Sequence, residues 1–148
     1  MLHHDGRWTH EGHPITHAKL REHFDRSVAF LPAEGDSGKY VVTLRHFRGE
    51  VIVEEAGFFV RDFEPSSGRI SLSDRSEEVL DAATLDASPR DGALRCRVKF
   101  DLASDGLLAR FDHAAQADLL HAVEEHAGGF GLRFGGAWHP IPDRALDA

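Results

Sequence analysis

The stretch Ala93–Leu102, ALRCRVKFDL, gives the clearest strand signal in the chain, and the expected fold is built outward from it. Its side chains alternate strictly between two kinds, apolar Leu94, Cys96, Val98 and Phe100 and basic Arg95, Arg97 and Lys99. A period of two predicts a strand with one face in the core and one in solvent. The turn ASDG (103–106) and the run GLLARF (106–111) supply an antiparallel partner.

Upstream, four short runs rich in β-branched and aromatic residues predict an antiparallel meander. They are KYVVTLRHF (39–47), EVIVEE (50–55), GFFVRDFE (57–64) and GRISLS (68–73). In the third run, strict alternation places Arg61 on the same face as Phe59 and Phe63. Neither face of that strand is purely apolar, so we expect both faces to be partly covered.

Two helices are expected, one on each side of the strand-rich middle. The first begins at Thr16, whose hydroxyl can cap a free amide, carries Leu20, Phe24 and Val28 as an apolar stripe, and ends before Pro32. The second covers residues 113–127, with Asp112 as its cap and Gly128 after its end. Its expected buried stripe is Ala115, Leu119, Leu120, Val123 and Ala127.

This order of elements predicts an α+β protein made of two small related lobes, each an antiparallel sheet with one main helix. The weakly patterned stretch 74–92 is interpreted as the connection between them. The first lobe is therefore expected over residues 1–85 and the second over residues 86–148, packed together as one compact unit. A final hairpin is expected from FGLRF (130–134) and AWHPIP (137–142).

Composition limits the classes of partner and compartment. The 148 residues are 41% hydrophobic and 28% charged, as in an ordinary globular protein, and folding can bury a sizeable core. A formal net charge of −8 disfavours nucleic acid as a partner. Because Cys96 is the single cysteine, and neither a signal peptide nor a membrane span is predicted, we expect a cytoplasmic protein.

Eleven histidines raise the hypothesis of a metal site, since imidazole is a common ligand of zinc and nickel. Five of them lie near the start of the chain: His3, His4, His10, His13 and His17. Their spacing matches no helical metal-binding motif, and Pro14 places His13 outside the first helix. A metal-binding protein or metal-dependent hydrolase that uses these histidines is therefore kept as the alternative function, and no cofactor is predicted.

Motifs for catalysis are missing from the sequence: it has no GxSxG elbow, no phosphate-binding GxxxxGK[ST] loop and no GxGxxG after a strand. Cys96 falls on an apolar strand face, which favours a packing role. Arginines interleaved with phenylalanines on the meander are more informative, because they could line a groove for an anionic ligand or a peptide. The alternative interpretation is that their stems cover apolar surface.

The order of motifs resembles a bacterial family known as domain-of-unknown-function family twelve-eighty-five. The resemblance rests on DGRWTHEGHPI (5–15), on Leu20 and Phe24 in the first helix, on Tyr40, Val42 and Thr43, and on Val53, Glu54 and Phe58. Two departures stand out. Leu44-Arg45-His46 replaces the Pro-Val-Glu of the family, and Glu55-Ala56-Gly57 replaces an Asp-Ala-Pro.

The resemblance implies two related α+β lobes, the second like a pleckstrin-homology domain, with a role in signal transduction and a binding site between the lobes. We therefore expect a binding or adaptor module without catalytic chemistry. Its partner would be a protein or a small anionic ligand. The predicted site residues are Trp8, His13, Arg45, Glu54, Arg61 and Arg110. In it the arginines would contact an anion or a peptide carboxylate, and Trp8 would form a stacking wall.

Overall fold

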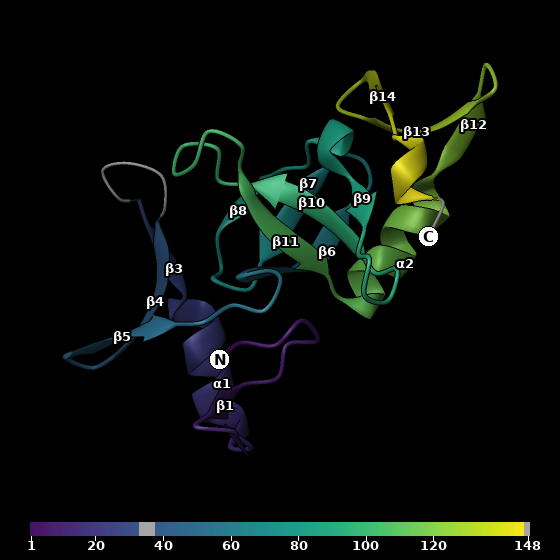
Figure 1. The fold of residues 1–148 in the computed structure, drawn as a ribbon. Helices are drawn as coiled ribbons and strands as arrows, with labels where there is room; N and C mark the ends of the chain where they lie inside the picture. Colours follow the sequence, from purple (N-terminus) through teal and green to yellow (C-terminus); the bar gives the residue numbers. More distant parts are fainter. Residues whose placement is uncertain (33–37, 147–148) are drawn as a thin grey trace.

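The fold is described from a computed structural model that covers residues 1–32 and 38–146 (Figure 1). Its centre is a six-stranded sheet in the order β8-β7-β6-β11-β10-β9. The strands are β6 (Phe58–Glu64), β7 (Arg69–Leu72), β8 (Glu77–Val79), β9 (Asp86–Ala87), β10 (Leu94–Val98) and β11 (Leu107–Phe111). All neighbours are antiparallel except β6 and β11, which pair in parallel.

The predicted pair of strands around residues 93–111 is confirmed as β10 and β11, with Cys96 opposite Ala109. Leu94, Cys96 and Val98 are buried, as the alternation predicted. Phe100 is not: it is 44% exposed, because β10 ends at Val98 and Lys99 takes a left-handed conformation (φ 54°) that turns the chain. The strand is therefore shorter than its sequence pattern.

An N-terminal unit lies to one side of the central sheet (Figure 1). It contains the hairpin β1 (Thr9–His10) and β2 (His13–Pro14), the helix α1 (Ala18–Ser27), and the sheet β3 (Ala29–Leu31), β4 (Lys39–Leu44) and β5 (Phe47–Val51). The predicted cap at Thr16 is wrong, since His17 is the N-cap and its ring accepts the Leu20 amide. Val28 is buried, while Leu20 and Phe24 are only partly covered.

The C-terminal part follows β11. It contains α2 (His113–Ala122), the sheet β12 (Glu124–His126), β13 (Gly129–Phe134) and β14 (Ala137–Pro140), and the short 3-10 helix η2 (Asp143–Ala145). The second helix was predicted too long, because Val123 turns to extended geometry and the next three residues pair with β13. Of the predicted stripe, Ala115 and Leu119 are buried, whereas Leu120 is 44% exposed.

The α+β class is confirmed, but the sheets are not divided between the two predicted lobes. Strands from both sides of residue 85 share the central sheet, because β6 pairs with β11, and the 3-10 helix η1 (Ala82–Thr84) leads directly into β9. The division into residues 1–85 and 86–148 stays a prediction. Neither α1 nor α2 is long and apolar enough to cross a membrane.

The N-terminal unit meets the central sheet through a close contact at Gly57. A Cβ at this position would lie 2.3 Å from Cε1 of Tyr40, whose ring packs against Phe58 at 6.0 Å. The chain therefore needs glycine where the resembling family has proline. Close packing against Tyr40 is therefore the physical reason for glycine at this position.

Candidate ligand pocket

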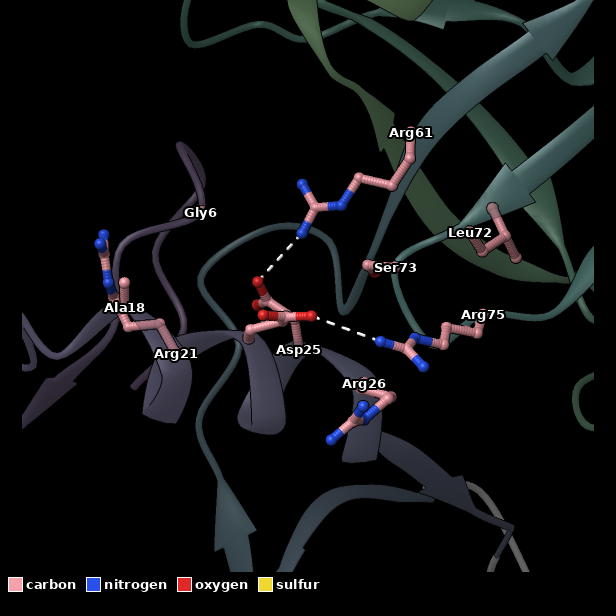
Figure 2. A pocket seen from close by; sticks show the side chains of 10 residues that line it. Gly6, Ala18, Arg21, Asp25, Arg26, Arg61, Leu72, Ser73 and Arg75 are labelled. Carbon is pink, nitrogen blue, oxygen red and sulfur yellow. Dashed lines mark hydrogen bonds and ion pairs between the residues drawn. The ribbon is translucent and has the colours of Figure 1, made fainter.

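A cavity of about 380 Å³ lies between α1 and the end of the central sheet (Figure 2). Here it is called the arginine pocket. Four of the ten residues that line it are arginines; the full set is Gly6, Ala18, Arg21, Glu22, Asp25, Arg26, Arg61, Leu72, Ser73 and Arg75. In an acidic chain, this local excess of positive charge favours an anion as the occupant.

Helical spacing explains how α1 contributes its part of the pocket. Arg21 and Asp25 lie four residues apart, as do Glu22 and Arg26, so these side chains form one polar face of α1. The opposite face carries Leu20 and Phe24 and packs toward β4. The polar face is thereby directed at the central sheet.

Arg61 enters the pocket from a β-bulge in β6. The register between β6 and β7 shifts between Val60 and Asp62, so Arg61 is the extra residue on its strand. A bulge re-aims a side chain and interrupts strict alternation. It also shifts the phase of the strand, so that Val60 and Phe63 are both buried. Phe58 and Phe59 are neighbours that point to opposite faces and are both buried, so both faces of β6 are covered, as predicted.

Two ion pairs join α1 to the central sheet across the pocket, as Figure 2 shows. One Arg61 nitrogen donates to Asp25 at 3.0 Å, and the other donates to Asp112 at 2.9 Å. Arg75 donates to Glu22 at 3.3 Å. Arg75 holds a left-handed conformation (φ 70°) that is costly for a residue with a side chain, and it thereby faces α1.

Asp25 connects the pocket to the core of the N-terminal unit. Its other oxygen accepts the indole N–H of Trp8 at 2.8 Å, and the Trp8 ring packs on Phe24 with centroids 5.3 Å apart. Burial raises the pKa of Asp25, although the hydrogen bond from Trp8 and the charge of Arg61 act in the opposite direction. Trp8 is only 3% exposed, so most of its ring packs inside the unit, and its role as a stacking wall for a ligand stays a prediction.

One buried donor among the residues that line the pocket has no hydrogen-bond partner in the described part of the chain. The Nε atom of Arg21 is buried and has no hydrogen-bond partner among the described residues. The one hydroxyl in the lining, that of Ser73, already accepts the Phe59 amide at 2.9 Å. A ligand that brings acceptors would therefore complete the hydrogen bonding of the pocket.

Glu54 and Arg110 belong to a different cluster, here called the Glu55 network, formed by His3, His4, Glu54, Glu55, Asp86, Ser88, Arg90, Asp91, Arg95 and Arg110. The Glu55 carboxylate lies 3.6 Å from each of Arg90, Arg95 and Arg110 and accepts the Ser88 hydroxyl at 2.7 Å. These contacts tie the segment before β6 to β10, β11 and the turn before β10.

Glu54 and Arg110, the two predicted site residues in this network, are each paired with side chains of opposite charge. Arg110 binds Asp91 through two nitrogens, at 3.1 and 2.5 Å, which holds the pKa of Asp91 below its usual range. Hydrogen bonds from His4, first from its ring and then from its amide, hold the pKa of Glu54 at about 2, with smaller contributions from His3 and Arg90. Of the six predicted site residues, Arg61 alone lines the arginine pocket, and Trp8 reaches it through Asp25.

His13 and Arg45 are exposed and lie outside both clusters. His13 pairs with His10 in the first hairpin, and Arg45 occupies the tight turn between β4 and β5 with φ 56°. Within the described residues, no group of three or more His, Cys, Asp or Glu side chains is placed to hold a metal ion.

The charged pocket residues that sequence reasoning missed are Arg21, Glu22, Asp25, Arg26 and Arg75. The spacing of opposite charges four apart on α1 was the available signal. Such pairs are usual on any solvated helix, so the spacing alone does not distinguish a pocket wall from open surface.

Two solved structures have folds similar to that of this chain. The chain resembles the crystal structure of a DUF1285 family protein from Silicibacter pomeroyi DSS-3, with a TM-score of 0.61 and 19% sequence identity over 95% of this chain and 77% of that one. It also resembles a DUF1285 family protein from Shewanella baltica OS155, with a TM-score of 0.50 and 18% identity over 81% of this chain and 88% of that one.

Searches by sequence found no match, either to a family model or to a curated protein. The structural likeness confirms, at the level of the fold, the resemblance predicted from the order of motifs. The chain therefore has the fold of the DUF1285 proteins.

Proposed function

We propose that this chain is a member of the DUF1285 family and acts as a binding module for a small oxyanion, a carboxylate or phosphate, in the arginine pocket. The observation that carries the proposal is the group of three arginines, Arg26, Arg61 and Arg75, around one cavity, with Arg21, whose buried Nε has no hydrogen-bond partner among the described residues, beside it (Figure 2). Guanidinium groups bind carboxylate and phosphate oxygens through paired, charge-assisted hydrogen bonds. A cavity of about 380 Å³ has the size of a small-molecule site.

The position of the pocket also suggests how binding would be reported to a partner protein. Arg61 and Arg75 fasten α1 to the central sheet through Asp25 and Glu22. A bound oxyanion would compete with those carboxylates for the same guanidinium groups, so that occupancy changes how α1 is held. This coupling supports a non-enzymatic adaptor role in bacterial signal transduction.

Titration calorimetry with inorganic phosphate and with succinate tests the proposal. We expect saturable binding of at least one of these anions. Arg21→Gln and Arg75→Gln should each weaken it about tenfold or more, because each removes a charge-assisted hydrogen bond. Arg69→Gln is the matched control, since Arg69 is exposed, pairs with Glu77 and lies outside the pocket.

Two results would overturn the proposal. The first is the absence of saturable binding of either anion by the folded protein. The second is binding that Arg69→Gln weakens as much as Arg21→Gln and Arg75→Gln do, which would indicate nonspecific attraction to surface charge.

A further inference from the structure

A second opening lies on the other side of α1, between the edges of two strands. It has a volume of about 600 Å³ and is called the strand slot here. Eight of the twelve residues that line it are apolar, namely Met1, Trp8, Ile15, Leu20, Phe24, Val42, Leu44 and Val51. The other four are Thr9, His10, Gly49 and Glu50. The slot shares no lining residue with the arginine pocket.

The start of the chain already fills one end of this gap as a strand. The Leu2 amide donates to Ile52 at 2.9 Å and the Glu54 amide donates to Leu2 at 2.9 Å, which makes Leu2 a parallel neighbour of Val53. On its other side Leu2 bridges Trp8 in antiparallel fashion, and the Thr9 amide donates to Met1 at 3.0 Å. A short strand thus lies between the continuation of β5 and the start of β1.

Beyond Met1, the gap between β5 and β1 continues without a strand in the part of the chain that the structure describes. β5 is an edge strand of its sheet. The carbonyl of Ile52 and the amide of Glu54 point outward from this edge and bind Leu2. Along a strand, the backbone N–H and C=O groups of every second residue point to the same edge. Arg48 and Glu50 therefore present their amides and carbonyls to the slot.

The floor of the slot is suited to the alternating side chains of a strand. Leu20 and Phe24 of α1 form it together with Val42, Leu44 and Val51 of the sheet. Every second side chain of an inserted strand would point at this floor. Met1 (43% exposed) and Leu44 (39% exposed) both line the slot, so its rim exposes apolar side chains.

We propose that the strand slot binds an extended peptide of a partner protein, which inserts as a β-strand beside β5 and continues the line of the N-terminal strand. The unpaired edge selects this occupant, because an inserted helix or a small apolar molecule would leave the backbone groups of Arg48 and Glu50 without partners. An extended chain pairs with them by β-augmentation and places alternate apolar side chains against α1. The pairing of Leu2 with the same edge is the precedent for this geometry.

The probe is a blocked heptapeptide of alternating threonine and valine carrying a fluorescent label, with binding followed by anisotropy. We expect saturable binding and slower exchange of the Arg48 and Glu50 amides by hydrogen–deuterium exchange. The same peptide with alternate backbone amides methylated should bind at least about tenfold more weakly, since methylation removes the donors that pair with β5.

Variants of the protein separate edge pairing from simple apolar contact. Glu50→Pro removes the outward amide and should abolish binding, whereas Glu50→Ala loses the same ion pair with Lys39 but keeps that amide and should bind normally. Leu20→Gln should weaken binding by polarising the floor. Leu120→Gln changes an equally apolar, 44% exposed side chain on α2 and should have no effect.

A tethered form makes a weak intrinsic affinity measurable. Joining the heptapeptide directly before Met1 raises its effective concentration to the millimolar range. If the tethered chain leaves the exchange of Arg48 and Glu50 unchanged, the proposal is wrong. It is equally wrong if Glu50→Pro and Glu50→Ala bind the free peptide alike, or if an anilinonaphthalene sulfonate dye fills the slot and the peptide cannot displace it.

Discussion

Replacing Asp25 by alanine should destabilise the N-terminal unit, because this one carboxylate serves both Trp8 and Arg61. The Trp8 indole is 3% exposed, and its N–H would lose its acceptor, which costs about 1 to 3 kcal/mol. The ion pair with Arg61, whose side chain is 39% exposed, adds at most about 1 kcal/mol. Relief of the burial that raises the pKa of Asp25 offsets part of this, so we expect a net loss of about 2 kcal/mol.

Asp25→Asn is the matched variant, since the amide oxygen can still accept the indole N–H and no charge has to be buried. Its loss should be below about 1 kcal/mol. Urea unfolding at pH 7, followed by circular dichroism, measures both changes. Equal losses for the alanine and asparagine variants would refute the central role given to the Trp8 hydrogen bond, and so would an alanine variant within about 0.5 kcal/mol of the parent.

Three further predictions follow from burial, close packing and titration. Leu119→Ala should cost about 2 to 5 kcal/mol, because Leu119 is 1% exposed, whereas Leu120→Ala on the exposed face should cost far less; similar losses in urea unfolding would contradict the packing of α2. Gly57→Ala should cost about 1 to 3 kcal/mol because its Cβ would meet the Tyr40 ring, and Tyr40→Leu should recover part of that loss if the clash is the cause. Glu54 has a folded pKa of about 2, below its ordinary 4.5, so it contributes stability at neutral pH that is lost as the pH falls from about 4.5 through 2. Glu54→Gln should therefore be less stable than the parent at pH 7, with the difference shrinking in acid, and a difference independent of pH in thermal melts would contradict the assignment.

Sequence patterning predicted the parts of the fold that depend on local periodicity. The strands at Leu94–Val98 and Leu107–Phe111 and the existence of two helices followed from alternation and from helical spacing. The ends of these strands and helices did not follow from local patterns, because tertiary contacts determine where each element stops. Glu124 and Glu125 favour a helix locally, yet they pair with Gly131 and Phe130 in a sheet.

The candidate site was predictable only in part, for a physical reason. Arg61 could be selected because a basic residue among phenylalanines is unusual on a strand. Arg21 and Arg75 become pocket residues only when α1 is placed against the β7–β8 turn, and no local pattern reports that placement. Glu54 and Arg110 were selected for their charge, and the structure satisfies that charge within the Glu55 network.

The parallel pairing of β6 with β11 has a consequence for how the protein folds as it is synthesised. Phe58 finds its partner in Ala109, and the antiparallel strands β7 to β10 all lie between them in sequence. Closing so long a loop delays the pairing, and topologies with many distant contacts fold slowly. Until β11 has left the ribosome, the apolar side chains of β6 have no permanent neighbour on that edge, so a chain stalled or cut before Leu107 should aggregate instead of forming a stable half.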